Sequence, residues 1–207
     1  ISLNILSFIS KLIEKDRDMN LKPNTDGIVA SNSIGFMARD KEILYKAIKV
    51  AIGVEMADDY GKVLSDQKYE GIKSEVIKIK DPLAPRNELV PYLKDILSKC
   101  DIFIIKEGPI DLDGFGDSLF GHFDKRTKAI QEASGKGYVR VCNIAGASAM
   151  SLPLEGLGEA LLLMCESKED KIAKLLKLGS LINEVHDELI ERYFLDLNNY
   201  FNEGYQI

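Results

Sequence analysis

Apolar positions recur at two different spacings along this 207-residue chain. In segments 3–13, 43–52 and 175–193 they recur every three or four residues, which is the spacing of an amphipathic helix. Short runs rich in β-branched residues, above all 101–108 (DIFIIKEG), are typical of buried strands. Because the two patterns alternate, the sequence predicts an α/β domain with a single mixed sheet covered by helices.

The predicted elements fill one domain that spans residues 1–207. In chain order they are an N-terminal helix within 1–20, a strand at 27–33, a helix from 40 to Gly61, a strand at 74–80, a helix at 87–100, a strand at 101–108, a basic helix at 123–134, a strand at 138–146 and helical segments over 155–201. The apolar stripe of the last segments is long enough to pack across a homodimer interface.

Composition narrows the partners that this domain can have. A net charge of −6 and a pI near 5.1 disfavour binding to nucleic acid, so an anionic ligand must be met by a local cationic group. The three cysteines, Cys100, Cys142 and Cys165, are widely spaced and indicate buried thiols in a reducing cytoplasm. The apolar runs are shorter than the roughly 20 residues of a membrane span, which predicts a cytoplasmic protein without a membrane segment.

Polar, small residues follow three of the predicted strands, in segments 30–36, 106–122 and 142–150. In open α/β sheets, ligands bind beyond the carboxyl ends of the strands, and small residues let backbone N–H groups approach an anion. We therefore expect the three segments to converge on one cleft that holds phosphate. The sequence contains neither GxxxxGK[ST] nor GxGxxG, so this cleft would not be a P-loop or a dinucleotide fingerprint.

The segment 106–129 holds the richest chemistry of the chain, because four aspartates, one histidine and a basic cluster follow a buried strand. Glu107 and Asp117 are candidate Mg²⁺ ligands, since this cation prefers carboxylate oxygens and bridges them to phosphates. Lys106, Lys125 and Arg126 are candidate phosphate contacts, and His122 is a candidate catalytic group. The alternative is a solvated loop in which Asp117 or Asp124 caps a helix and the basic cluster forms an ordinary polar face.

Hydroxyl and amide side chains complete the predicted nucleotide site. They are Ser31, Asn32, Ser33, Ser118 and Ser148. Each of them also has a plain structural interpretation, and for 30–33 that interpretation is a turn with Asn32 in a left-handed conformation.

The order of these motifs resembles the inosine-triphosphate-pyrophosphatase-like proteins. The counterparts are Ser31-Asn32, then Lys106-Glu107-Gly108 with the run 110–114, and then the segment 122–129. The resemblance covers about 100 residues and implies that family's fold, a bound nucleoside triphosphate and Mg²⁺. It would make Glu107 the family's metal-holding acidic position.

Two departures from that pattern change the expected reaction. Hydrolytic members carry adjacent carboxylates at the acidic motif, whereas this chain has Lys106 beside Glu107; and Ser33 and Ile34 stand where a basic residue is expected. Without the pair that activates water, a nucleotide cradle can serve a transferase. The chain is thus similar to the guanylyltransferase family of methanogenic archaea that builds the iron-guanylylpyridinol cofactor, which implies GTP, Mg²⁺, a pyridinol acceptor and a homodimer.

Two other functions remain open at this point. One is a nucleoside triphosphate pyrophosphatase, which would need a second carboxylate close to Glu107 in space. The other is a non-catalytic dimeric binding module whose polar loops are merely solvated. The sequence alone leaves the nucleotide base and the acceptor undecided.

Overall fold

The computed structural model describes residues 2–5, 34–38, 40–108, 137–156, 158–183 and 185. Within these ranges seven strands form one sheet in the order β2-β1-β6-β7-β5-β3-β4. Strand β3 pairs in parallel with β4 and β5, whereas the other neighbouring pairs are antiparallel. The prediction of a mixed sheet in an α/β fold is confirmed.

The bounds of the described elements follow the chain. They are β1 (Ser2–Ile5), β2 (Ile34–Met37), α2 (Lys41–Ile52), β3 (Val63–Ser65), β4 (Glu75–Val76), α3 (Arg86–Leu97), β5 (Ile102–Glu107), α5 (Val139–Ala145), β6 (Ala147–Pro153), β7 (Ala160–Glu166) and α6 (Glu169–Leu181).

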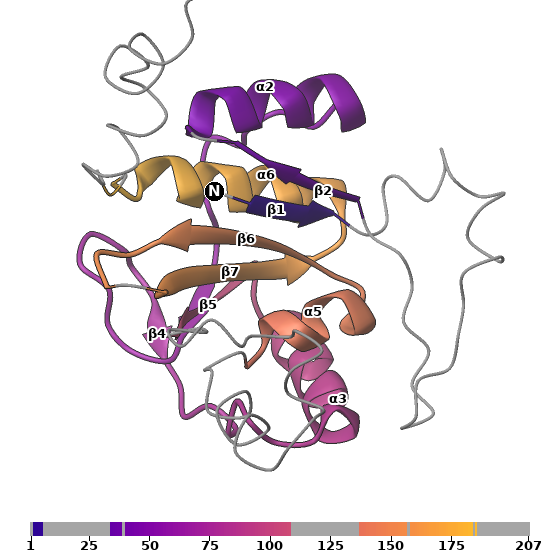
Figure 1. The fold of residues 1–207 in the computed structure, drawn as a ribbon, viewed down its shortest axis with the longest axis vertical. Coiled ribbons are helices and arrows are strands. Elements are labelled where there is room, and N and C mark those ends of the chain that lie inside the picture. Colours follow the sequence, from indigo (N-terminus) through magenta and orange to yellow (C-terminus); the bar gives the residue numbers. More distant parts are fainter. Residues whose placement is uncertain are drawn as a thin grey trace, which may run out of the picture.

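Helices cover both faces of the sheet (Figure 1). Helices α2 and α6 pack on one face, where Leu44 and Leu175 join one apolar cluster, and α3 and α5 pack on the other, where Leu93 and Val141 join a second. Strand β5 contributes side chains to both clusters, because successive residues of a strand point to opposite faces of the sheet. Ile102 and Ile104 lie in the first cluster, and Phe103 and Ile105 lie in the second.

Helix α2 begins and ends at residues suited to those positions. The Asp40 carboxylate accepts a hydrogen bond from the Ile43 N–H at 2.8 Å, which satisfies one of the free donors of the first turn. Gly53 ends the helix in the left-handed conformation, with φ of 73°. The helix therefore ends well before Gly61, where the sequence pattern placed its end.

A charged cluster joins α6 to the start of β5. The Asp101 carboxylate accepts hydrogen bonds from the ammonium groups of Lys171 and Lys174, at 2.6 and 2.8 Å, and from the Lys62 N–H at 2.6 Å. Burial alone would raise the pKa of Asp101, but these donors outweigh it and hold the pKa well below its usual range. The ionised carboxylate thus ties a helix of one face to two strands.

The three cysteines are free and buried, in agreement with the expectation of buried thiols. Burial raises the pKa of each thiol, to about 11 for Cys100 and further for Cys142 and Cys165.

The structure overturns three of the predicted elements. Residues 2–5, expected to be helical, form β1, which pairs antiparallel with both β2 and β6. Segment 138–146, expected to be a strand, contains helix α5. Residues 160–166, expected within a C-terminal helix, form the buried strand β7, and the helix α6 follows it.

Other predicted elements have mixed outcomes. Helix α3 and strand β5 lie where the sequence placed them, and Pro91 lies inside α3. Of the strand expected at 74–80, only Glu75–Val76 pairs in the sheet. The strand expected at 27–33, the basic helix at 123–134 and the segment after 185 lie outside the described residues.

Candidate functional site

The carboxyl ends of β3, β4 and β5 lie at one edge of the sheet because these strands are parallel. This edge is the position at which open α/β sheets bind ligands. Asp66 directly follows β3, Lys106 and Glu107 end β5, and the segment 108–129 continues from there. The described part of the candidate site is therefore this carboxyl edge.

Glu107 points into the protein and is only 5% exposed. Its Oε1 accepts a hydrogen bond from the Val139 N–H at 3.0 Å, at the start of α5. Burial raises the pKa of Glu107 to about 7, although the N–H groups of Val139, Tyr138 and Gly137 and the charge of Arg140 favour the carboxylate. Glu107 thus joins the end of β5 to the first turn of α5.

Lys106 points the other way and is the more accessible of the two side chains. It is 38% exposed, and its Nζ lies 2.8 Å from Oε2 of Glu159, which precedes β7. Its backbone N–H donates to Oδ2 of Asp66 at 3.3 Å, while Oδ1 of Asp66 accepts from the Tyr69 hydroxyl at 2.6 Å. Two carboxylates therefore flank this lysine, one at its side chain and one at its backbone.

The segment that follows β4 closes the same edge of the sheet. The Arg140 guanidinium donates to the carbonyl oxygens of Pro82 and Ala84, at 3.0 and 2.5 Å, and the Tyr138 hydroxyl donates to the Lys80 carbonyl oxygen at 3.0 Å. Helix α5 thus holds both Glu107 and the chain between β4 and α3. These contacts fix the frame around the strand end.

Ser148 does not join Lys106 and Glu107. Along β7, Glu107 is opposite Ala160 and Ser148 is opposite Cys165, five positions away, or about 17 Å at about 3.3 Å per residue. Ser148 is buried, and its hydroxyl lies 2.9 Å from that of Ser167. The expected convergence of segment 142–148 with 106–108 is wrong, because residues 139–145 are a helix and Ser148 lies at the opposite edge of the sheet.

The remaining predicted site residues lie outside the described residues. They are Ser31, Asn32, Ser33, Asp117, Ser118, His122, Lys125 and Arg126. Their roles stay predictions.

Three residues of the carboxyl edge were missed by sequence reasoning. Asp66 carried a signal, since it is the first charged residue after the apolar pair Val63 and Leu64. Glu159 and Arg140 carried none, because the first was assigned to a helix and the second to a strand.

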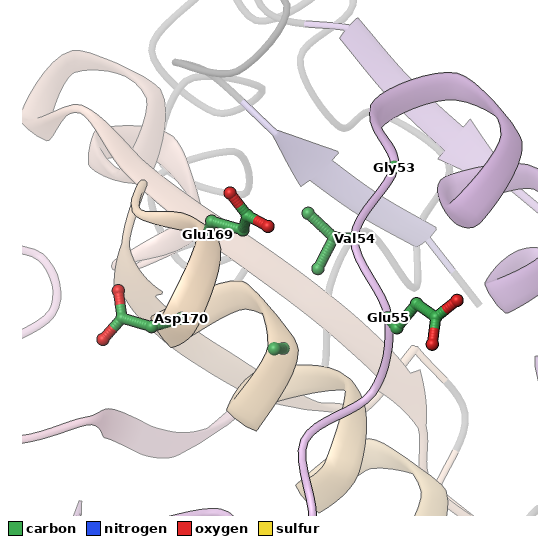
Figure 2. A pocket seen from close by; sticks show the side chains of 6 residues that line it. Gly53, Val54, Glu55, Glu169 and Asp170 are labelled. Carbon is green, nitrogen blue, oxygen red and sulfur yellow. The ribbon is translucent and has the colours of Figure 1, made fainter.

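Two hollows open elsewhere on the described surface, and none of the predicted site residues lines either of them. The larger, of about 470 Å³, lies between the end of α2 and the start of α6. In Figure 2 Val54 points toward α6, whereas the carboxylates of Glu55 and Asp170 point away from each other. Glu55 also pairs with Lys49 at 2.7 Å, so its carboxylate is already engaged by a cation.

The second hollow, of about 350 Å³, lies where α3 and α5 end and α6 begins. Lys94 and Lys168 line it together with Glu166, and Lys168 pairs with Glu166 at 2.8 Å. It lies at the end of β7 opposite to Glu159, and it is therefore separate from the carboxyl edge of β5.

Mg²⁺ does not fit Glu107 as the described residues arrange it. Oε1 is engaged by a backbone donor, and the side chain is sealed from solvent. No group of three or more potential metal-ligating side chains occurs among the residues that the structure describes. A metal role for Glu107 would require its carboxylate to leave the first turn of α5, and the role of Asp117 lies outside the described residues.

In the described ranges no helix combines the length and apolar character needed to cross a bilayer. No protein-family model, curated protein or solved structure matches this chain. The fold and the chemistry of the carboxyl edge are therefore the basis for assigning a function.

Proposed function

We propose that the protein is a nucleotidyltransferase that joins GMP from GTP to the hydroxyl of a pyridinol and releases pyrophosphate. The proposal includes the inosine-triphosphate-pyrophosphatase-like fold, a cytoplasmic homodimer and a helical C-terminal contact between its subunits. The observation that supports it most is the position of Lys106. Its side chain, which is 38% exposed, lies at the carboxyl end of a parallel strand, where the glycine-rich and aspartate-rich segment begins.

The reaction asks the protein mainly for positioning and for neutralisation of charge. In our proposal the pyridinol oxygen attacks the α-phosphorus of GTP, and the bond from that phosphorus to the bridging oxygen breaks. Pyrophosphate leaves, and the hydroxyl proton passes to solvent. Mg²⁺ enters as the GTP complex and is therefore part of the substrate.

The chain's own residues bind and orient that substrate. Lys106 contacts the phosphates, together with Lys125 and Arg126 from the sequence prediction. The hydroxyl and amide side chains of 31–33 and Ser118 donate hydrogen bonds. Glu107 holds the strand end in place through α5, which fixes the backbone of Lys106.

The observation that favours the pyrophosphatase alternative is the pair of carboxylates beside Lys106. Asp66 and Glu159 both contact Lys106, which precedes Glu107 in the chain. A hydrolase needs carboxylates close to the phosphates to orient the attacking water. In this second candidate function the same edge binds the same nucleotide, but water takes the place of the pyridinol.

One incubation separates the two functions. The full chain is mixed with GTP, Mg²⁺ and a pyridinol, and mass spectrometry follows the GMP adduct while pyrophosphate is assayed. We expect the adduct to form and pyrophosphate to appear only when the pyridinol is present. Equal release of pyrophosphate without the pyridinol would establish the hydrolase, and no heat of GTP binding in calorimetry would leave a non-catalytic module.

A matched pair of variants tests the role of Lys106. Lys106→Met should lower the rate about 100-fold, which is the typical effect of removing one donor that stabilises the transition state. Lys99→Met is the control, because Lys99 forms a similar pair with Asp95 on the surface. A rate unchanged in Lys106→Met would remove the carboxyl edge of β5 from the proposal.

A further inference from the structure

The Glu159 carboxylate is placed to hold the side chain of Lys106 in position. The two side chains form an ion pair of 2.8 Å, and they are 23% and 38% exposed. The pair between Glu166 and Lys168, at the other end of β7, has the same 2.8 Å separation but exposures of 32% and 61%. Solvent therefore screens the pair of Lys106 and Glu159 less than the pair of Lys168 and Glu166.

The turn between β6 and β7 fixes the position of Glu159. Its N–H donates to the carbonyl oxygen of Gly156 at 3.0 Å, and its carbonyl oxygen accepts from the Leu154 N–H at 3.1 Å. A Cβ atom at Gly156 would lie 2.2 Å from Oε2 of Glu159, so the carboxylate occupies space that any other residue would fill. The carboxylate of Glu159 thus lies directly over Gly156 of the turn.

The end of β5 makes room for Glu159 from the opposite side. A Cβ atom at Gly108 would lie 2.5 Å from the carbonyl oxygen of Gly158 and 2.8 Å from Cα of Glu159. The chain just after Lys106 and Glu107 therefore packs directly against the turn. Gly156 lies against the carboxylate of Glu159, and Gly108 lets the end of β5 approach the backbone of the same turn.

Among the described residues, the two charged side chains that contact Lys106 are both carboxylates. Glu159 neutralises the side chain, and Asp66 places a second carboxylate at the backbone N–H of the same residue. A bare triphosphate that contacts Lys106 comes close to these two carboxylates, and repulsion between like charges weakens its binding. A triphosphate that carries its own divalent cation does not meet the same repulsion.

We propose that Glu159 is the positioning residue for Lys106 and makes this edge select a nucleotide complexed with a divalent cation over the free nucleotide. This inference rests on the proposed nucleotide-binding function. Glu159 holds the Lys106 ammonium at the strand end until a phosphate oxygen takes the place of the Glu159 carboxylate. The negative charge of Glu159 repels phosphate that carries no divalent cation. Its effect is therefore on which form of the nucleotide binds.

Calorimetry on the full chain tests the selection directly. GTP and inorganic tripolyphosphate are titrated with Mg²⁺ and, separately, with EDTA, into the native protein, Glu159→Gln and Glu166→Gln. We expect the native protein and Glu166→Gln to bind the Mg²⁺ complexes at least tenfold more tightly than the free anions. In Glu159→Gln the ratio should fall about tenfold, through tighter binding of the free anions, as expected when one repelling charge is removed.

The outcomes separate the inference from the function on which it rests. An unchanged ratio in Glu159→Gln, or an equal loss of both forms as a merely structural residue would give, overturns the role of Glu159 while the nucleotide site stands. Absence of binding by the native protein, with either probe and with or without Mg²⁺, overturns both. Glutamine has nearly the same shape as glutamate, and circular dichroism at the titration temperature checks that the variants are folded.

Discussion

Replacement of Glu107 by glutamine should remove a specific pH dependence from the stability of the protein. Burial raises the pKa of Glu107 to about 7 in the folded chain, against 4.5 for an ordinary glutamate. Between these two values the unfolded chain has lost the proton that the folded chain still holds. The free energy of unfolding therefore falls as the pH rises through this window.

The magnitude follows from the width of the window. A shift from 4.5 to about 7 corresponds to about 3 kcal/mol, at about 1.4 kcal/mol per pKa unit. The contribution of Glu107 is complete below pH 4.5 and is lost by about pH 8. Glutamine can keep the hydrogen bond from the Val139 N–H and never ionises, so Glu107→Gln should lack this loss.

Urea unfolding followed by circular dichroism measures the difference. At pH 5, 6, 7 and 8 the free energies of unfolding of the native protein and of Glu107→Gln are compared, so that the titration of all other groups cancels. The variant should gain about 2.5 kcal/mol on the native protein between pH 5 and 8, because part of the full difference is already lost at pH 5. Glu75→Gln, at an exposed position of β4, is the control and should show no such gain. A difference that stays flat with pH would refute the burial of an ionisable Glu107.

Two further substitutions, each with a control, test the frame around the site. Asp101→Asn removes the charge that Lys171 and Lys174 share, and it should lower the free energy of unfolding by about 2 kcal/mol in the same urea titration. Its control, Asp95→Asn in an exposed pair, should lower it by less than about 0.5 kcal/mol. Gly108→Ala should cost about 3 kcal/mol in thermal unfolding, because φ is +108° and the new Cβ meets backbone atoms. Its control, Gly53→Ala, has φ of +73° and nothing within 4 Å, and should cost about 1 kcal/mol. Equal costs for the two glycine variants would contradict the close approach at Gly108.

The sequence predicted the elements whose local pattern and surroundings agree. Helix α2 has a capping Asp40 and an apolar face, and β5 has a run of buried β-branched residues between two helices. For these elements the local preference and the packing of the whole fold favour the same structure.

Where prediction failed, long-range contacts overruled the local pattern. The segment 138–146 is rich in valine, but Glu107, more than 30 positions earlier, accepts a hydrogen bond from the first turn of α5. Strand β7 is apolar over Leu161–Cys165 because both of its faces are covered, and a continuous apolar run of this kind resembles a buried helix.

The site residues were predicted correctly only where the element that carries them was predicted correctly. Lys106 and Glu107 were placed correctly at the end of a strand, since that strand was correctly predicted. Ser148 was grouped with them only because α5 was taken for a strand, and Glu159 was missed because β7 was taken for a helix. The opposed directions of Lys106 and Glu107 come from the strand's alternation, but which of them faces inward depends on helix packing.

The buried thiols give the protein built-in reporters of its own opening. Cys142 lies on the buried face of α5 and Cys165 lies in the central strand β7, and an alkylating reagent can reach neither while the layers stay closed. The labelling rate of each cysteine therefore reports how often the helical layer that covers it separates from the sheet. Comparison of the two rates shows whether the layer that contains α5, the helix that binds Glu107, opens separately or only when the whole chain unfolds.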